Sequence, residues 1–425
     1  MASSSWPWAT LPPDLLRFIT SDGFGLPLES YSSVRGVCTA WRSALPPPTP
    51  LLLAVSGFDA PRHRQVHPGQ LVSASLLTAD PDHHYHRSPF RLSDLPTGGD
   101  LVGSSNGWIA VDPIWPGIFL INPLAAPGGE VVLEPLRDGG GGGEPVLKVA
   151  FAPNPTPGDY TAVAICGPRR LAYATTRDDA ATCGRRWTLV DVAVADERDR
   201  LVDLVYDAGA SGKAYCVTAH GEVHVFHAPG SSCRRRRPRV SPLHPQPQGA
   251  KRGAAASGLF APPYDEAARL TGAAKSIFLS GGSLYQVWRN AAAAVSWRTP
   301  EGGRFGVAKD EVFVLKYDPN NPKRRRPCWN AVSDLGGCSV FVGKNSPVVL
   351  RPEDATGVRP NCVYWINEES RFQPMVLDMA TRKSTMLPFG AKGESREARR
   401  PLCWFFLNDK VASIDGDGSK VDNDE

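Results

Sequence analysis

Hydrophobic positions follow two different periods along the chain, and the change falls near residue 46. Before that point they recur at helical spacing. Pro12, Pro13 and Asp14 can begin a helix, because the first helical positions need no backbone donor and favour a negative charge. Apolar residues then follow at i, i+1 and i+4, namely Leu15, Leu16 and Ile19. The pattern predicts one short amphipathic helix here.

A second helix is predicted over residues 32–45. Ser32 or Ser33 can cap its start, and the prolines at 46–48 would end it. Its apolar side chains fall at i, i+3, i+4 and i+7, at Val34, Val37, Cys38 and Trp41. Two such short helices cannot bury all of their apolar surface alone. We therefore expect them to contact a partner or an adjoining domain.

After residue 50 the hydrophobic period changes to two, and short β-prone runs follow one another. They are separated by turn residues such as Asn106-Gly107 and the stretch 280–283, as in successive hairpins. No helix of ordinary length is expected between them. The number of short strands is too large for one β-sandwich. A ring of small sheets, as in a propeller, accommodates them and protects the edges of each sheet. The fold class is therefore mainly β: short N-terminal α-helices followed by a β-propeller-like domain.

The β-prone runs give the expected strands. They are 51–55, 101–105, 107–112, 117–122, 131–136, 147–151, 161–166, 170–176, 187–192, 201–207, 213–218, 222–227, 275–280, 283–288, 311–317, 328–335, 339–343, 362–367 and 375–380. Several tryptophans lie inside these runs and are expected to pack between strands, namely Trp187, Trp288, Trp329 and Trp365. No fixed-period signature of a known repeat is present.

Three segments lack any apolar period and are expected to be disordered. The first is a glycine-rich insertion near 137–145, and the second is an Arg/Pro/Ala-rich insertion at 231–258. The third is an acidic tail at 409–425, which is expected to be unstructured from about residue 413.

Composition and charge narrow the class of protein. Hydrophobic residues make up 42% of the 425 residues, enough for a sizeable core, and the formal net charge of +4 is too small to indicate nucleic-acid binding.

No apolar run approaches the roughly 20 residues that a membrane helix needs, and no signal peptide is indicated. The nine cysteines form no Cys-x-x-Cys pair and mostly lie in apolar runs, which indicates reduced thiols. We expect a soluble protein of the nucleus, the cytoplasm or both, without a membrane partner.

Candidate catalytic motifs fail on their context. Gly103–Gly107 fits G-x-S-x-G around Ser105, but a second strand follows where a nucleophile elbow needs a helix. The segment 337–345 resembles a phosphate loop with one residue too many and Asn345 at the Ser/Thr position. No catalytic residue and no cofactor are therefore expected, and the chain is not expected to be an enzyme. A hydrolase using Ser105 is the alternative.

No metal site is expected either. Histidines gather at 63, 67, 83, 84 and 86 in a polar stretch without a closed set of ligands at zinc spacing. Asp415-Gly416-Asp417-Gly418 is similar to the start of a calcium loop but lacks the twelfth-position glutamate.

Two basic runs are expected in exposed loops, one of them at 323–326. The other is a possible nuclear import signal, with RNA contact as a further alternative; it comprises Arg234, Arg235, Arg236, Arg237 and Arg239.

The N-terminal segment resembles an F-box. The pattern Leu11-Pro12-x-Asp14-Leu15-Leu16-x-x-Ile19, followed by 34–43 with Trp41-Arg42-Ser43, matches that family in order and spacing. The resemblance implies binding to the Skp-type adaptor of a cullin–RING ubiquitin ligase. It assigns the adaptor contacts to Leu11, Pro12, Leu15, Leu16, Ile19, Val34, Val37, Cys38 and Trp41. The sequence SDGFGLP between the two halves departs from the family pattern.

The remainder resembles the plant KIB-type β-propeller found behind F-boxes. The residues that carry this resemblance are 102–108, 120–124, 341–346 and 361–365. The domains expected are an F-box at 1–47, a KIB-type propeller at 48–408 and the acidic tail at 409–425. The resemblance implies a substrate-recognition subunit of an SCF-type ubiquitin ligase, whose propeller binds an unknown target protein. The alternative is a non-ligase interaction module with a degenerate F-box.

Overall fold

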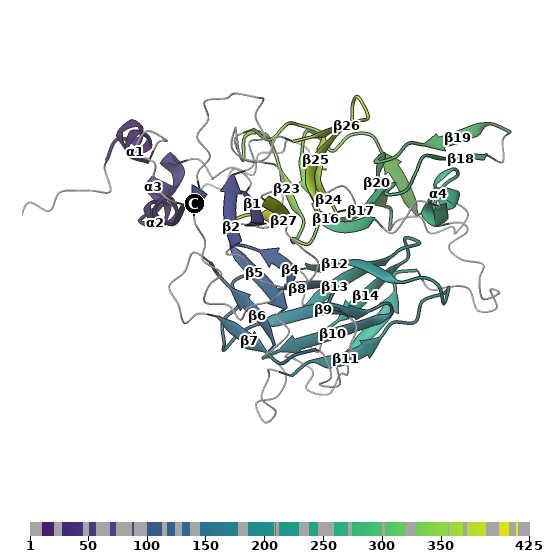
Figure 1. The fold of residues 1–425 in the computed structure, drawn as a ribbon, viewed down its shortest axis with the longest axis horizontal. Coiled ribbons are helices and arrows are strands. Elements are labelled where there is room, and N and C mark those ends of the chain that lie inside the picture. The colour runs from purple at the N-terminus through teal and green to yellow at the C-terminus, as the bar shows by residue number, and fades with distance from the viewer. Residues whose placement is uncertain are drawn as a thin grey trace, which may run out of the picture.

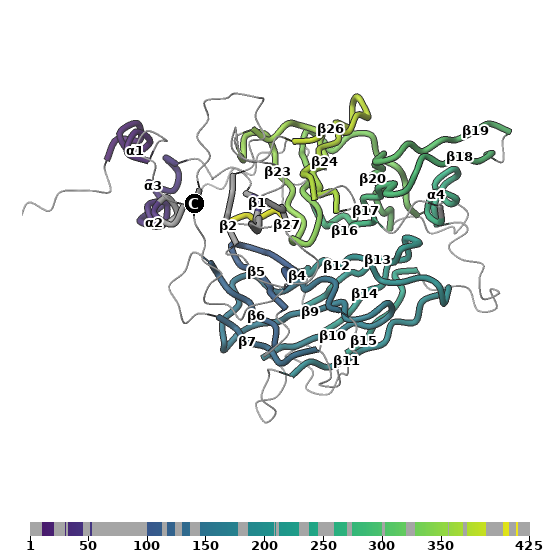
Figure 2. Tube along the Cα trace, in the orientation of Figure 1, coloured from purple at the N-terminus to yellow at the C-terminus, as the bar shows by residue number. Residues whose placement is uncertain are grey.

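Strands make up most of the described residues after residue 50, and Figure 1 shows them gathered into small sheets. The computed structural model describes residues 11–20, 28–45, 51–56, 69–73, 87–88, 100–112, 117–123, 130–136, 145–176, 186–207, 209, 212–228, 238–244, 259–270, 274–299, 302–319, 328–355, 357–368, 372–387, 399–407 and 414. Figure 2 traces these residues in colour and the others in grey.

Three short helices precede the strands and lie beside them as a group (Figure 1). They are α1 (Pro13–Thr20), α2 (Leu28–Gly36) and α3 (Thr39–Ala44). A fourth short helix, α4 (Tyr264–Leu270), follows the fourth sheet and packs Ala267 and Ala268 into the core.

Among the described residues, six sheets of four or five strands form the β domain, together with one two-stranded hairpin. The first sheet consists of β27 (Arg399–Phe405), β1 (Leu51–Ser56), β2 (Gly69–Ser73) and β3 (Arg87–Ser88). The second consists of β4 (Asp100–Ser105), β5 (Trp108–Asp112), β6 (Ile118–Ile121) and β7 (Val131–Leu133). The third consists of β8 (Lys148–Phe151), β9 (Thr161–Gly167), β10 (Arg170–Thr175) and β11 (Thr188–Asp191).

The next three sheets follow in chain order. The fourth sheet consists of β12 (Leu201–Asp207), β13 (Lys213–Thr218), β14 (Val223–His227) and β15 (Arg239–Pro242). The fifth consists of β16 (Lys275–Ser280), β17 (Ser283–Arg289), β20 (Val312–Tyr317) and β21 (Trp329–Val332). The sixth consists of β23 (Val348–Leu350), β22 (Ser339–Phe341), β24 (Cys362–Asn367), β25 (Gln373–Asp378) and β26 (Lys383–Met386). The hairpin is β18 (Val295–Arg298) with β19 (Arg304–Val307), and it projects from the fifth sheet (Figure 1).

Neighbouring sheets contact one another through their first strands, which produces a ring. Strand β4 contacts β8, β8 contacts β12, and β12 contacts β16. Apolar clusters fill the gaps between sheets. The cluster around Trp288 joins the fourth and fifth sheets, for example, and the cluster around Phe341 joins the sixth and first. Fully burying one large apolar side chain contributes about 1.5–3 kcal/mol, so these clusters hold the ring together.

The ring is closed by pairing the two ends of the β domain. Strand β27 pairs antiparallel with β1, so that Leu52 lies opposite Trp404. Ser104 Oγ donates a 2.8 Å hydrogen bond to the Trp404 carbonyl, which links β27 to the second sheet as well. The first sheet therefore takes its innermost strand from the far end of the sequence.

The expected mainly-β class, with helices before a propeller, is confirmed. Each expected run contains a strand, and the expected packing of Trp288, Trp329 and Trp365 is confirmed by their burial. Trp187 is half-buried and donates from Nε1 to the Glu134 carbonyl at 2.8 Å. The strands that the sequence did not predict are β2, β3, β15, β18, β19, β23, β26 and β27.

Two segments expected to be disordered contain ordered residues. Arg239–Pro242 forms β15 and pairs with β14, so the predicted insertion at 231–258 is wrong for these residues. Ile414, in the predicted unstructured tail, packs on the apolar cluster of the fifth and sixth sheets. Its amide donates to Ser280 Oγ at 3.1 Å. Both segments gain order from contacts with other strands, which local composition does not encode.

The described cysteines carry free thiols, as expected for reduced cysteines. Cys216, Cys338, Cys362 and Cys403 are buried. Burial raises the pKa of the thiols of Cys216 and Cys403 to about 12.

Candidate functional site

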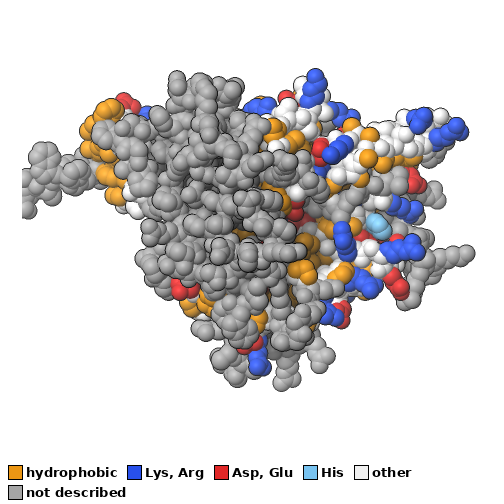
Figure 3. Space-filling view, viewed as in Figure 1, with side chains coloured by type: hydrophobic (Ala, Val, Ile, Leu, Met, Phe, Trp, Pro, Cys, Tyr) orange, Lys and Arg blue, Asp and Glu red, His pale blue; other side chains and the backbone are white. Residues whose placement is uncertain are grey.

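Helix α1 divides its side chains between a buried and an exposed face. Leu16 and Thr20 are buried, whereas Leu15, Phe18 and Ile19 are 45%, 62% and 43% exposed. The three exposed residues recur at i, i+3 and i+4, so they share one side of the helix. Figure 3 shows hydrophobic atoms gathered there. We call Leu15, Phe18 and Ile19 the α1 apolar face.

A hydrogen bond beside this face links helix α1 to α3, and two further polar contacts lie within α1. Arg17 Nε donates a 2.9 Å hydrogen bond to the Ala44 carbonyl, and Arg17 also pairs with Asp14. Thr20 Oγ1 donates to the Leu16 carbonyl at 2.9 Å. The Arg17–Ala44 contact thus joins α1 to α3, and none of the three contacts covers the apolar face.

The predicted continuous helix over 32–45 is wrong. The structure has α2, which begins already at Leu28 and ends at Gly36, and then the separate α3. Cys38 is extended, with φ −159° and ψ 170°, and its Sγ accepts a hydrogen bond from the Trp41 amide at 3.4 Å. Gly36 disfavours helix continuation, and Cys38 caps the next helix. The helical spacing of Val34, Val37, Cys38 and Trp41 therefore does not define one face.

The structure distributes the predicted adaptor contacts unevenly. Pro12, Leu15, Ile19 and Val37 are exposed, and Leu16 is buried. The partly buried residues are Leu11, Val34, Cys38 and Trp41. Phe18, at 62%, is more exposed than Leu15, Ile19 and Val37, and the sequence pattern does not include it.

The predicted basic signal falls mostly outside the described residues, which do not include Arg234–Arg237. Arg239 is described. It is exposed on β15, opposite His227 of β14, so it belongs to a strand rather than to a loop. The run at 323–326 and the histidines at 63, 67, 83, 84 and 86 also lie outside the described residues.

The rejected catalytic motifs are strand segments, as their context indicated. Ser105 is buried at the end of β4, and Asn106 and Gly107 have φ of 47° and 77° in the turn that leads to β5. Positive φ at both central residues is typical of a type I′ hairpin. The segment after Gly337 forms β22, and Asn345 Nδ2 donates to the Phe341 carbonyl at 3.1 Å.

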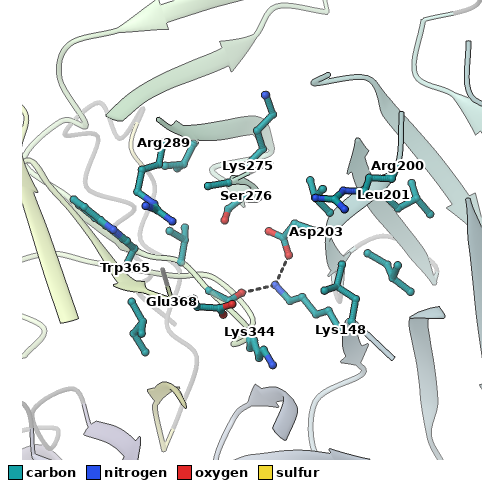
Figure 4. Close-up of a pocket in the computed structure, with 18 of the residues that line it drawn as sticks. Lys148, Arg200, Leu201, Asp203, Lys275, Ser276, Arg289, Lys344, Trp365 and Glu368 are labelled. Carbon is teal, nitrogen blue, oxygen red and sulfur yellow. Dashed lines mark hydrogen bonds and ion pairs between the residues drawn. The ribbon is translucent and has the colours of Figure 1, made fainter. Parts of the chain in front are cut away.

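A cavity of about 690 Å³ lies where the first strands of four sheets converge. Its walls come from the ends of β8, β12, β16 and β24 and from the loop that follows β22 (Figure 4). Most of its lining side chains are apolar, including Leu147, Ile165, Val287, Val312 and Ile366.

One wall of this cavity carries a buried ion pair. Lys148 Nζ lies 2.5 Å from Asp203 Oδ1 and donates to the Gly343 carbonyl at 2.8 Å. Asp203 also accepts the amides of Leu204 and Ile277, at 2.8 and 3.0 Å. Burial raises the pKa of the Asp203 carboxyl, and the Lys148 ammonium opposes that shift. The pair ties the third, fourth, fifth and sixth sheets together.

Lys275 contributes its stem to the cavity but turns its ammonium away (Figure 4). Nζ donates to the carbonyls of Ala219 and Ala268 at 2.6 and 3.1 Å and lies 4.9 Å from the centre of the Trp288 ring. Burial lowers the pKa of Lys275 to about 7, and Asp199 opposes this shift.

Other polar side chains converge on the middle of the cavity. Arg200, Ser276 and Arg289 point toward it in Figure 4. Arg289 is held by Asp310 at 3.0 Å and by Asn367 at 3.4 Å. Trp365 is only 5% exposed, and its indole Nε1 has no hydrogen-bond acceptor among the described residues. An apolar cavity with a few converging polar groups is the usual form of a ligand site.

Within the described part of the chain, no group of three or more His, Cys, Asp or Glu side chains could hold a metal ion. No helix among the described residues is both long enough and apolar enough to cross a membrane.

Solved structures that align with this chain share little of its sequence. Apo AztD from Citrobacter koseri aligns at TM-score 0.29 and 12% identity, over 62% of this chain and 60% of the AztD chain. BBS1N in complex with ARL6DN aligns at TM-score 0.29 and 11% identity, over 77% of each chain. The Cps50 (Swd1) β-propeller domain of Myceliophteria thermophila aligns at TM-score 0.31 and 8% identity, over 70% and 90%.

A search of curated proteins finds no match to the sequence. The family model of the KIB1-4 beta-propeller, in contrast, matches residues 76–389, which include strands of all six sheets. The resemblance to a KIB-type propeller is thereby confirmed, and the chain belongs to the KIB1-4 beta-propeller family.

Proposed function

We propose that this chain is a plant F-box protein that acts as the substrate-recognition subunit of an SCF-type cullin–RING ubiquitin ligase. The propeller is a protein-interaction module and would bind the target. The N-terminal helices would bind the Skp-type adaptor, and through it the cullin. In this proposal the chain performs no bond chemistry. It raises the local concentration of target lysines near the conjugating enzyme, in the nucleus, the cytoplasm or both.

The observation that carries the proposal is the α1 apolar face. Three large apolar side chains, Leu15, Phe18 and Ile19, are exposed on one side of an eight-residue helix. Val37, between α2 and α3, adds a further exposed apolar side chain at 59%. Clustered exposed apolar side chains on a fixed scaffold mark protein–protein contact sites. The F-box pattern supplies the identity of the expected partner.

The test is the affinity of the purified full-length chain for a recombinant Skp-type adaptor, measured by calorimetry. Leu15→Asp/Ile19→Asp should weaken binding at least 100-fold, because central apolar contacts each contribute about 2 kcal/mol or more. The matched control is Leu189→Asp. Leu189 is 54% exposed on β11, away from the helices, so this change should leave the affinity unaltered.

Two results would instead support an interaction module with a degenerate F-box. One is a wild-type chain that fails to bind the adaptor. The other is equal binding by the wild type and the Leu15→Asp/Ile19→Asp variant.

A further inference from the structure

The cavity at the convergence of the first strands has the size of a small-molecule site. Its volume of about 690 Å³ falls within the roughly 300–1,000 Å³ of such sites. The apolar side chains of four sheets form its walls, so it favours a ligand with an apolar body. The pair of Lys148 and Asp203 is satisfied within the wall and leaves no uncompensated charge there.

The remaining polar groups favour an anion. The guanidinium of Arg200 extends toward the middle of the cavity, and the Ser276 hydroxyl points toward the same space (Figure 4). Neither side chain has a hydrogen bond or ion pair within the described residues. Arg289 faces them with its guanidinium fixed by Asp310. Guanidinium groups form strong charge-assisted hydrogen bonds with carboxylate, phosphate and sulfonate oxygens.

Two further observations restrict where the anion lies. Glu368, an exposed carboxylate of the lining, stands on the other side of the cavity from Arg200 in Figure 4 and would repel an anion there. Trp365 lines the cavity with a buried indole N–H that has no acceptor in the described structure. This nitrogen is covered by the surrounding side chains, so the anion is placed beside Arg200 and Ser276 rather than at Trp365.

We propose that this cavity binds a small amphipathic organic anion, with its apolar body between the strand ends and its charged group between Arg200, Ser276 and Arg289. The site lies wholly within the propeller, so the proposal requires neither the adaptor nor a target protein. It therefore stands or falls separately from the ligase function.

The probe is 8-anilinonaphthalene-1-sulfonate, an apolar body with one negative charge, titrated into the full-length chain by fluorescence. The Leu15→Asp/Ile19→Asp background places two charges on the α1 apolar face and so disrupts it as a competing site. We expect saturable binding of one probe per chain and about tenfold weaker binding by Arg200→Gln. N-phenyl-1-naphthylamine, which lacks the sulfonate, should bind both proteins equally. Octanoate should displace the anionic probe at concentrations where octanol does not.

Matched variants make the result specific to the cavity. Arg298→Gln removes an exposed guanidinium from the β18–β19 hairpin and should not change probe affinity. Ser276→Phe should block both probes while the thermal unfolding midpoint stays within a few degrees of wild type. The proposal is overturned if binding does not saturate, or if Arg200→Gln leaves the anionic probe unaffected. It is also overturned if Arg200→Gln weakens both probes alike.

Discussion

The ammonium of Lys148 and the carboxylate of Asp203 lie 2.5 Å apart, although both side chains are buried and belong to different sheets. Asp203 accepts two backbone amides in addition, one of them from Ile277 on the next sheet. The pair therefore fixes the spacing of neighbouring first strands at the centre of the ring.

Removing one member of this pair should destabilise the fold strongly. Asp203→Asn or Lys148→Met leaves the other charge buried and uncompensated, which costs about 3–5 kcal/mol. The double change Lys148→Met/Asp203→Asn should recover most of that loss, because it leaves no buried charge and keeps a side-chain oxygen that can accept a backbone amide. Urea denaturation measures the free energy of unfolding of each variant. A single variant within about 0.5 kcal/mol of wild type would contradict the structural role of the pair.

Stability should rise with pH above neutrality because of Lys275. Burial lowers its pKa to about 7 in the folded chain, against an ordinary value of 10.5. Between these pH values the unfolded chain holds a proton that the folded chain has released. The free energy of unfolding should therefore increase by up to about 1.4 kcal/mol per pH unit.

The part of this increase that Lys275 causes is measured by comparing the free energy of unfolding at pH 7 and pH 9 in variants. Lys275→Met should remove the increase, whereas Lys309→Met, at an exposed lysine, should retain it. An equal increase in wild type and Lys275→Met would show that another group causes it.

Gly103 should tolerate no side chain. A β-carbon there would overlap the backbone carbonyl of Val149 on β8, where two first strands approach closely. Gly103→Ala should lower the free energy of unfolding by at least about 2 kcal/mol. Gly158 has nothing within 4 Å of its β-carbon position, so Gly158→Ala should be nearly neutral in the same denaturation series. Equal effects of the two changes would contradict the close approach.

The buried thiols should be chemically inert in the folded chain. Burial raises the pKa of Cys216 and Cys403 to about 12, so almost no thiolate forms at pH 8. Iodoacetamide should modify the partly buried Cys166 before Cys216 and Cys403, as mass spectrometry of the peptides would show. In denaturing urea Cys166, Cys216 and Cys403 should react with iodoacetamide at similar rates. Modification of Cys216 as fast as Cys166 under native conditions would argue against its burial.

The strands were predictable wherever an apolar run alternates within one local segment, as in Thr161–Gly167 or Cys362–Asn367. Strands such as β15 and β18 were not, because Arg239–Pro242 and Val295–Arg298 are polar or short and become ordered by pairing. The division of α2 from α3 depends on Gly36 and Cys38, whose effect the spacing of apolar residues hides.

The α1 apolar face was largely predictable, since Leu15 and Ile19 follow helical spacing, whereas Phe18 falls at a position that the pattern leaves unspecified. The cavity was not predicted. Its one signal in the sequence is a charged residue inside an apolar run, as at Lys148 and Asp203. Such a residue indicates a buried polar contact, but its partner depends on which strands become neighbours in the ring, and that is a property of tertiary structure.

The pairing of Leu52 with Trp404 also affects how the protein is made. A ribosome adds about 5–20 residues per second, so β1 is synthesised tens of seconds before β27 can pair with it. During that interval β1 lacks its inner partner, and an unpaired strand edge invites association with other chains. Nascent chains should therefore depend on chaperones until synthesis passes residue 405. Mutations that weaken β27 should reduce the yield of soluble protein before they reduce the stability of molecules that have folded.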